Sequence, residues 1–187
     1  MTLELSWLAA ATLPAQDIVA PEDRIKAAFV YNFPKFVEWP TNAFATPAAP
    51  LVIGILGKDP FGTVLDDLVK NRTINNRKVE LVRYRRVEDV TLVHVLFISE
   101  SERRRLPSVL NELRDKPVLT VSDIEGFKRQ GGMIGLIKVE NNIRFEINRE
   151  AASREGLLLS SKLLRLDKPP STPDEKPSKT PDSSDPK

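Results

Sequence analysis

The chain contains no cysteine and only one histidine among its 187 residues. The absence of cysteine excludes disulfide frameworks, thiolate zinc sites and thiol catalysis, and a single imidazole excludes any site that needs two. With 28 basic against 26 acidic residues, the sequence also lacks the positive excess of a dedicated nucleic-acid binder. We therefore expect no nucleic-acid partner, and no motif calls for a metal or a cofactor.

Both ends of the chain are predicted to lie outside the folded domain. Residues 167–187 contain no large apolar side chain and carry six of the fifteen prolines, which predicts a disordered tail. Residues 5–13 are apolar but too few to span a bilayer. Followed by Pro14 and Ala15, they resemble the centre of an export signal, although the residues before them include Glu4 and no basic side chain. We expect a signal-peptide remnant at 1–15 and one domain at 16–166; a short or frayed N-terminal helix is the alternative.

The central sequence alternates between helix and strand patterns. Pro21 with acidic neighbours opens a helix, whose apolar stripe comprises Ile25, Phe29, Phe33 and Val37. Pro34 predicts a kink or break in the turn before it, and the helix should end before Pro40. The strands predicted after it are 51–56, 78–83, 93–98 and 118–121, and the helices are 60–70, 102–113 and 124–130.

The last third of the domain predicts a hairpin and a helical end. Residues 133–139 and 143–147 flank a turn at 140–142, as antiparallel strands do. Residues 149–166 should be helical but broken at Gly156, and should pack back through Leu159, Leu163 and Leu166. The fold class is therefore α/β: a three-layer sandwich with a mixed, mostly parallel sheet and an antiparallel hairpin near the C-terminal end.

No catalytic constellation can be assembled from these residues. The glycine-rich turn at 54–62 matches no phosphate-binding motif, and Asp59 there is expected to cap the helix at 60–70. Ser99 lacks a nucleophile elbow, and His94 precedes it by five residues in the same predicted strand, so we expect His94 to be a structural residue. We interpret the acidic pairs and arginine clusters as a salt-bridged surface and Gly131-Gly132 as a helix end. The sequence does not indicate an enzyme.

The densest cluster of aromatic residues lies at 31–40, where Tyr31, Phe33, Phe36 and Trp39 supply four of the twelve aromatic side chains. One interpretation is a helix end buried in the core. The other is that part of the cluster, especially Trp39, forms an exposed contact surface.

Several segments together resemble one known family. The runs KAAFVYNFPKFVEWP, LVIGILGKDPFG, HVLFIS, GGMIGL, IRFEIN and GLLLSSKLLRL are similar to the YfiR, or YfiR/HmsC-like, family, and they occur in the family's order between residues 26 and 166. The resemblance implies a non-enzymatic periplasmic protein that represses an inner-membrane diguanylate cyclase by contacting its periplasmic portion, thereby lowering cyclic di-GMP and biofilm formation. It also leaves an outer-membrane lipoprotein antagonist and a homodimer as partners to consider. Redox control through cysteines, available to some relatives, cannot apply to this chain.

The resemblance supplies no catalytic motif to transfer, so the candidate functional residues are those of a contact surface. We predict that Phe36 and Trp39 contact the partner, with Lys35 and Glu38 as flanking polar residues. A rival hypothesis is a periplasmic sensor that binds a small molecule at the carboxyl ends of the strands, near Gly57 and Ser99.

Overall fold

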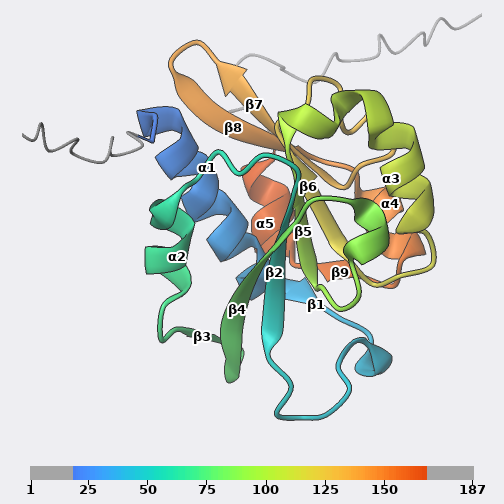
Figure 1. The fold of residues 1–187 in the computed structure, drawn as a ribbon. Coiled ribbons are helices and arrows are strands. Elements are labelled where there is room, and N and C mark those ends of the chain that lie inside the picture. Colours follow the sequence, from blue (N-terminus) through green and yellow to red (C-terminus); the bar gives the residue numbers. More distant parts are fainter. Residues whose placement is uncertain (1–18, 168–187) are drawn as a thin grey trace, which may run out of the picture.

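A seven-stranded sheet forms the centre of the computed structural model, which describes residues 19–167 (Figure 1). The strand order is β3-β4-β2-β5-β6-β7-β8, and the five strands from β4 to β7 run parallel. Their bounds are Thr73–Ile74 for β3, Arg77–Tyr84 for β4, Leu51–Leu56 for β2, Val95–Ile98 for β5, Leu119–Ser122 for β6, Ile134–Val139 for β7 and Asn142–Ile147 for β8. β3 and β8 pair antiparallel at the two edges, so the predicted mixed sheet with a C-terminal hairpin is confirmed.

Helices cover both faces of this sheet. One face carries α1 (Pro21–Asn32), α2 (Thr63–Val69), α4 (Arg149–Arg154) and α5 (Ser161–Leu166), whose buried side chains pack on Ile53, Ile55 and Phe97. The other carries α3 (Leu106–Glu112) and the loop after β6, which pack on Leu96 and Ile98. Because neighbouring residues of a strand point to opposite faces, β2 and β5 must be apolar throughout, and every residue of both is buried.

The segment after α1 breaks where Pro34 predicted. The α-helix ends at Asn32, a 3₁₀ turn follows at Phe33–Phe36, and the chain then extends as β1 (Val37–Glu38). β1 pairs antiparallel with β9 (Leu158–Leu159) in a separate two-stranded sheet. The predicted stripe is confirmed at Phe33 and Val37, which are buried, but Ile25 is 46% exposed because the buried face of α1 runs through Ala27 and Val30 instead.

Two predicted helices are shorter or absent for local reasons. The helix expected at 60–70 begins only at Thr63, because Gly62 has a positive φ of 50° that ends the preceding turn. Residues 124–130 form consecutive turns, since Gly126 has φ of 70°, which a right-handed helix cannot include. A third predicted helix, at 102–113, begins as a 3₁₀ turn over Glu100–Arg105, and α3 follows with Pro107 in its first turn, where a missing N–H is tolerated.

The C-terminal part follows the predicted plan except at Leu158–Leu159, which form β9 where a helix was expected. The hairpin turn consists of Glu140 and Asn141, one residue shorter than expected, because Asn142 already pairs with Val139. Gly156 separates α4 from β9 with φ of 75°, as its place in the sequence predicted. Leu163 is buried and Leu159 partly so, whereas Leu166 is 61% exposed and does not pack back. The predicted signal remnant and all but the first residue of the predicted tail lie outside the described residues.

Further short 3₁₀ turns at Thr41–Ala43 and Val87–Asp89 connect the larger elements. Among residues 19–167, no helix combines the length and the apolar character needed to cross a membrane.

Candidate functional site

The segment that carries the four predicted contact residues is fixed at both ends. Phe33 and Pro34 are the buried residues of the 3₁₀ turn, and Val37 is 3% exposed in β1. The amide of Ser160 donates to the carbonyl of Phe36 at 2.9 Å, which extends the β1–β9 pairing by one bond. The side chains that point outward from 35–38 are therefore held on a rigid backbone.

Three of the four predicted residues lie on one exposed surface. Lys35 and Glu38 are exposed and Phe36 is half-buried, with the Lys162 ammonium 5.6 Å from the centre of its ring. Leu158, directly opposite Glu38 in the β1–β9 pair, is 62% exposed. We call Lys35, Phe36, Glu38, Leu158 and Lys162 the β1–β9 surface. It combines apolar side chains with charges of both signs, a composition suited to protein contact.

Trp39 is separated from this surface by the alternation of the strand. Its half-buried indole donates to the carbonyl of Pro117 at 3.1 Å, just before β6. The ring packs edge-on against Phe44 and His94, with centroid distances of 6.2 and 6.3 Å. Trp39 therefore joins an aromatic cluster at the amino ends of the parallel strands, whereas Phe33 is buried in the core and Tyr31 and Phe36 are half-buried.

His94 is the centre of the aromatic cluster and is structural, as its position in the strand predicted. Phe44 stacks on it at 4.2 Å, and only 1% of the residue is exposed. The Val52 amide donates to Nδ1 at 3.0 Å, so the proton must sit on Nε2, which lies 3.1 Å from the Ala43 carbonyl.

Burial and the nearby charge of Arg77 hold the pKa of His94 below its ordinary value, although the bond to Ala43 opposes the shift. Arg77 stands over the other face of Phe44, with its guanidinium carbon 3.7 Å from the ring centre. It also donates to three carbonyls of the loop before β2, at Thr46, Pro47 and Ala49. These bonds tie the loop at 41–50 to the cluster.

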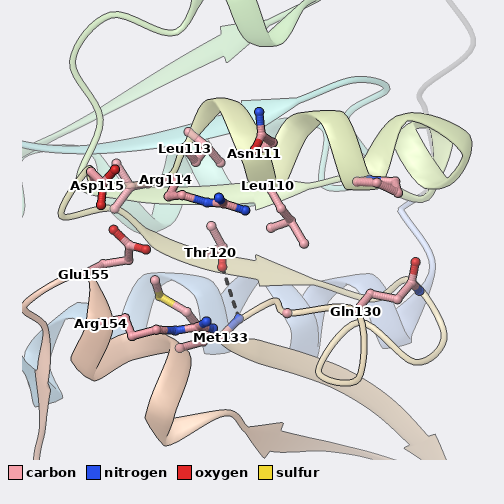
Figure 2. Close-up of a pocket in the computed structure, with 14 residues that line it drawn as sticks. Leu110, Asn111, Leu113, Arg114, Asp115, Thr120, Gln130, Met133, Arg154 and Glu155 are labelled. Atoms are coloured by element: carbon pink, nitrogen blue, oxygen red, sulfur yellow. Dashed lines mark hydrogen bonds between the residues drawn. The ribbon is translucent and has the colours of Figure 1, made fainter.

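A cleft of about 710 Å³ opens between α3, β6 and α4, away from the four predicted contact residues (Figure 2). Leu113, Met133 and Ala151 are buried in its floor, and Arg114 and Arg154 extend over it from opposite sides. Forty positions separate the two arginines in the sequence, so no local pattern could have paired them.

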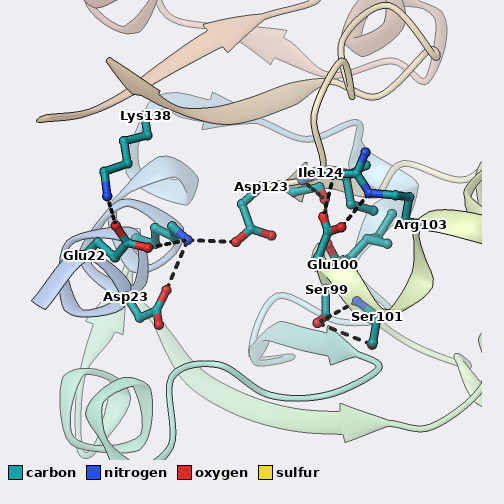
Figure 3. Close-up of polar contacts among 12 residues, drawn as sticks. Glu22, Asp23, Ser99, Glu100, Ser101, Arg103, Asp123, Ile124 and Lys138 are labelled. Carbon is teal, nitrogen blue, oxygen red and sulfur yellow. Dashed lines mark hydrogen bonds and ion pairs between the residues drawn. The ribbon is translucent and has the colours of Figure 1, made fainter. Parts of the chain in front are cut away.

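The crevice expected at the carboxyl ends of β2 and β5 is occupied by the protein itself. Gly57 has φ of 90° and packs directly against the hydroxyl of Ser101, which accepts a bond from the Lys58 amide at 2.9 Å. The hydroxyl of Ser99 lies 3.4 Å from that of Ser101 (Figure 3). Side chains thus fill the position where the rival sensor hypothesis placed a ligand.

Asp59 corrects a second expectation at the same edge. It does not cap α2; its carboxylate accepts from the Phe61 amide at 2.7 Å and from Arg83 Nε at 2.8 Å. Arg83 also binds Asp66, and these two carboxylates raise its pKa against the opposing effect of burial. The arginine clusters form a salt-bridged surface as predicted: Arg86 pairs with Asp89 and Arg103 with Glu100. Gly131-Gly132 does not end a helix; the Phe127 ring packs where a Gly132 side chain would stand.

An ion network that the sequence did not reveal joins α1 to the far side of the sheet. Lys26 donates to Asp123, just after β6, at 2.8 Å and pairs with Asp23 at 3.1 Å (Figure 3). Partial burial disfavours its charged form, but the two carboxylates outweigh that effect and raise its pKa. Glu22 binds Lys138 of β7 at 2.7 Å, which lowers the pKa of Glu22. The network fixes α1 against the hairpin.

A family model described as YfiR/HmsC-like matches residues 23–168, which include almost every described residue. No curated protein matches the chain.

Proposed function

Since this chain belongs to the YfiR/HmsC-like family, whose members are regulators rather than catalysts, we propose that it represses an inner-membrane diguanylate cyclase from the periplasm. The family indicates regulation of diguanylate cyclase signalling. Repression by protein contact, and the resulting fall in cyclic di-GMP and biofilm formation, are the proposal. The match over residues 23–168 is the observation that carries it, because it covers the whole sheet and both of its helical layers.

The β1–β9 surface supports a contact mechanism. A repressor that holds its partner inactive must bind the inactive state more tightly than the active one. Glu38 and Leu158 face each other across a paired backbone, and Phe36 lies beside them under Lys162. An exposed apolar residue within a ring of charges is typical of a protein interface.

We propose Lys35, Phe36 and Glu38 as contact residues on this surface and Trp39 as the residue that fixes the surface to the sheet. Trp39 keeps part of its indole accessible, so direct contact with the partner also remains part of the proposal. The indole N–H is already bonded to Pro117 and offers no hydrogen bond to a partner.

The proposal requires export. We propose that residues 1–15 direct the chain to the periplasm and are removed. A reporter fused after residue 19 should be active in the periplasm, and a fusion that stays cytoplasmic even with upstream codons restored would contradict this step.

The function is tested in cells that express the candidate cyclase. Deleting the gene should raise cyclic di-GMP, and the wild-type chain should restore the low level. Glu38→Lys and Leu158→Asp should fail to restore it while folding normally, because both side chains are exposed. Glu80→Lys makes the same charge change at an exposed position of β4 and serves as the matched control.

Two results would contradict the proposal. If deletion of the gene does not raise cyclic di-GMP, the proposed repressor function itself is contradicted. Repression restored by Glu38→Lys and Leu158→Asp as fully as by Glu80→Lys would remove the β1–β9 surface from the interface. Capture of the cyclase from solubilised membranes by the wild-type chain, and not by Leu158→Asp, would support direct contact.

A further inference from the structure

We infer that the cleft between α3, β6 and α4 is a binding site for a small organic acid: a molecule with one anionic group and an apolar body. The inference does not depend on a cyclase partner. It starts from the shape of the cleft, whose volume of about 710 Å³ lies within the range of small-molecule sites.

The cleft exists because the sheet is incomplete at this point. β7 pairs with β6 only at Val121 and Ser122, so the first half of β6 is paired with β5 on one side and has no strand on the other. α3 rises on one side of this gap and α4 on the other (Figure 2). Leu110, Leu113, Met133 and Ala151 line the gap and provide an apolar wall.

Two guanidinium groups flank this apolar wall. Arg114 follows α3 and Arg154 ends α4, and both extend over the cleft toward Leu110 and Met133 (Figure 2). Neither side chain makes a hydrogen bond or an ion pair within residues 19–167, unlike Arg77, Arg83 and Arg103. Two unpaired guanidinium groups above an apolar wall suit a carboxylate or phosphate attached to a hydrocarbon body.

The other polar groups of the cleft limit what the ligand can be. Asp115 and Glu155 stand together at one end, and one oxygen of Glu155 is buried without a hydrogen-bond partner in the described part of the chain (Figure 2). They repel any second negative group placed there. The Thr120 hydroxyl, which accepts from the Met133 amide at 3.1 Å, keeps its own proton to donate from the floor. The site therefore favours one anionic group, over the arginines, and not two.

Three probes of the same size and shape test this charge preference: benzoate, neutral benzamide and cationic benzamidine. Binding to the full chain would be followed by the shifts of the Thr120 and Met133 amide signals during titration. We expect benzoate to bind about tenfold more tightly than benzamide, and benzamidine not to bind more tightly than benzamide.

Variants of the two arginines test the site itself. Arg114→Gln and Arg154→Gln should each weaken benzoate about tenfold or more and leave benzamide unchanged, because each removes one charge-assisted bond. Both side chains are exposed and unpaired, so the variants should fold. Arg72→Gln, which changes an exposed arginine between α2 and β3, is the matched control and should bind benzoate like the wild type.

Three outcomes would overturn the inference. The first is no benzoate-dependent shift at millimolar concentration. The second is benzoate binding that survives both cleft substitutions or is lost equally in Arg72→Gln. The third is tighter binding of benzamidine than of benzoate, which would mean that Asp115 and Glu155 select the ligand instead.

Discussion

His94 couples the stability of the protein to pH. Both ring nitrogens are engaged, and Nδ1 must be unprotonated to accept from Val52. The folded chain therefore binds the proton with a pKa below 6.5, whereas the unfolded chain binds it near that value. Stability contributed by neutral His94 is complete above about pH 6.5 and is lost as the pH falls toward the folded pKa.

We accordingly expect the free energy of unfolding to fall as the pH drops below about 6.5, measured by urea denaturation at several pH values. Because His94 is the single histidine, the slope in this window can be assigned to it. His94→Asn supplies an acceptor for the Val52 amide without an ionisable ring. The variant should be less stable at neutral pH, and its free energy of unfolding should depend less on pH below that. An unchanged slope in the variant would show that other groups cause the acid sensitivity.

Trp39 should be important for stability whether or not it contacts a partner. Trp39→Ala removes the contacts with Phe44 and His94 and should cost about 3 kcal/mol, the low end for a large aromatic residue because the side chain is half-buried. Trp39→Phe keeps most of the packing but leaves the Pro117 carbonyl without its donor, at a cost of about 1 kcal/mol.

Thermal denaturation of both variants, with cellular cyclic di-GMP measured on each, separates stability from contact. A Trp39→Ala protein as stable as wild type would show that the cluster does not hold the fold. A stable Trp39→Phe protein that no longer represses would add Trp39 to the partner interface.

At the scale of elements, the short C-terminal helix depends on its cap. The hydroxyl of Ser160 accepts from the Leu163 amide at 3.3 Å, and Leu163 is the residue that buries α5 in the core. Ser160→Ala should lower stability by about 1 kcal/mol, whereas Ser161→Ala, one position into the helix, should change it by less than about 0.5 kcal/mol. Urea midpoints of the two variants make the comparison, and equal midpoints would contradict the capping role.

Elements could be predicted from the sequence where apolar runs or prolines decide them. The apolar run at 51–56 gave β2 with both ends correct, and Pro34 located the break after α1. The predictions at 60–62 and 124–130 were wrong because Gly62 and Gly126 adopt positive φ angles, which a right-handed helix does not include. Ile25 and Leu166 belong to apolar stripes in the sequence, but both are exposed because their helices turn other residues toward the sheet.

The candidate site was only partly visible in the sequence for a related reason. Lys35, Phe36 and Glu38 lie together because they are neighbours in the chain. Leu158, by contrast, reaches Glu38 only through the β1–β9 pairing, which joins segments 120 residues apart in the chain. Arg114 and Arg154 likewise come to line the same cleft only when the sheet has formed.

At the scale of the whole molecule, the folded unit should end at Asp167. Its carboxylate accepts from the Ile147 amide of β8 at 3.1 Å, which fixes the end of α5 to the hairpin. A chain truncated after Asp167 should melt within about 1 °C of the full chain, because residues 168–187 have no large apolar side chain to bury.

The same truncated chain with Asp167→Ala should melt about 2–4 °C lower, since a partly buried amide loses its acceptor at a cost of about 1 kcal/mol. Differential scanning calorimetry can resolve both changes. A lower melting temperature after truncation alone would show that the tail docks on the domain.

Trp39 can serve as an intrinsic fluorescent reporter because of where its indole is bonded. The sequence has two tryptophans, Trp7 and Trp39, so a chain that begins after Ala15 emits from Trp39 alone. Its indole ring contacts His94, and its N–H donates to the Pro117 carbonyl. Pro117 follows Arg114 and Asp115 of the cleft in the chain. Protonation of His94 should quench this emission, and a molecule that rearranges Arg114 should shift it, so one fluorescence channel can follow acidification and ligand entry without any added dye.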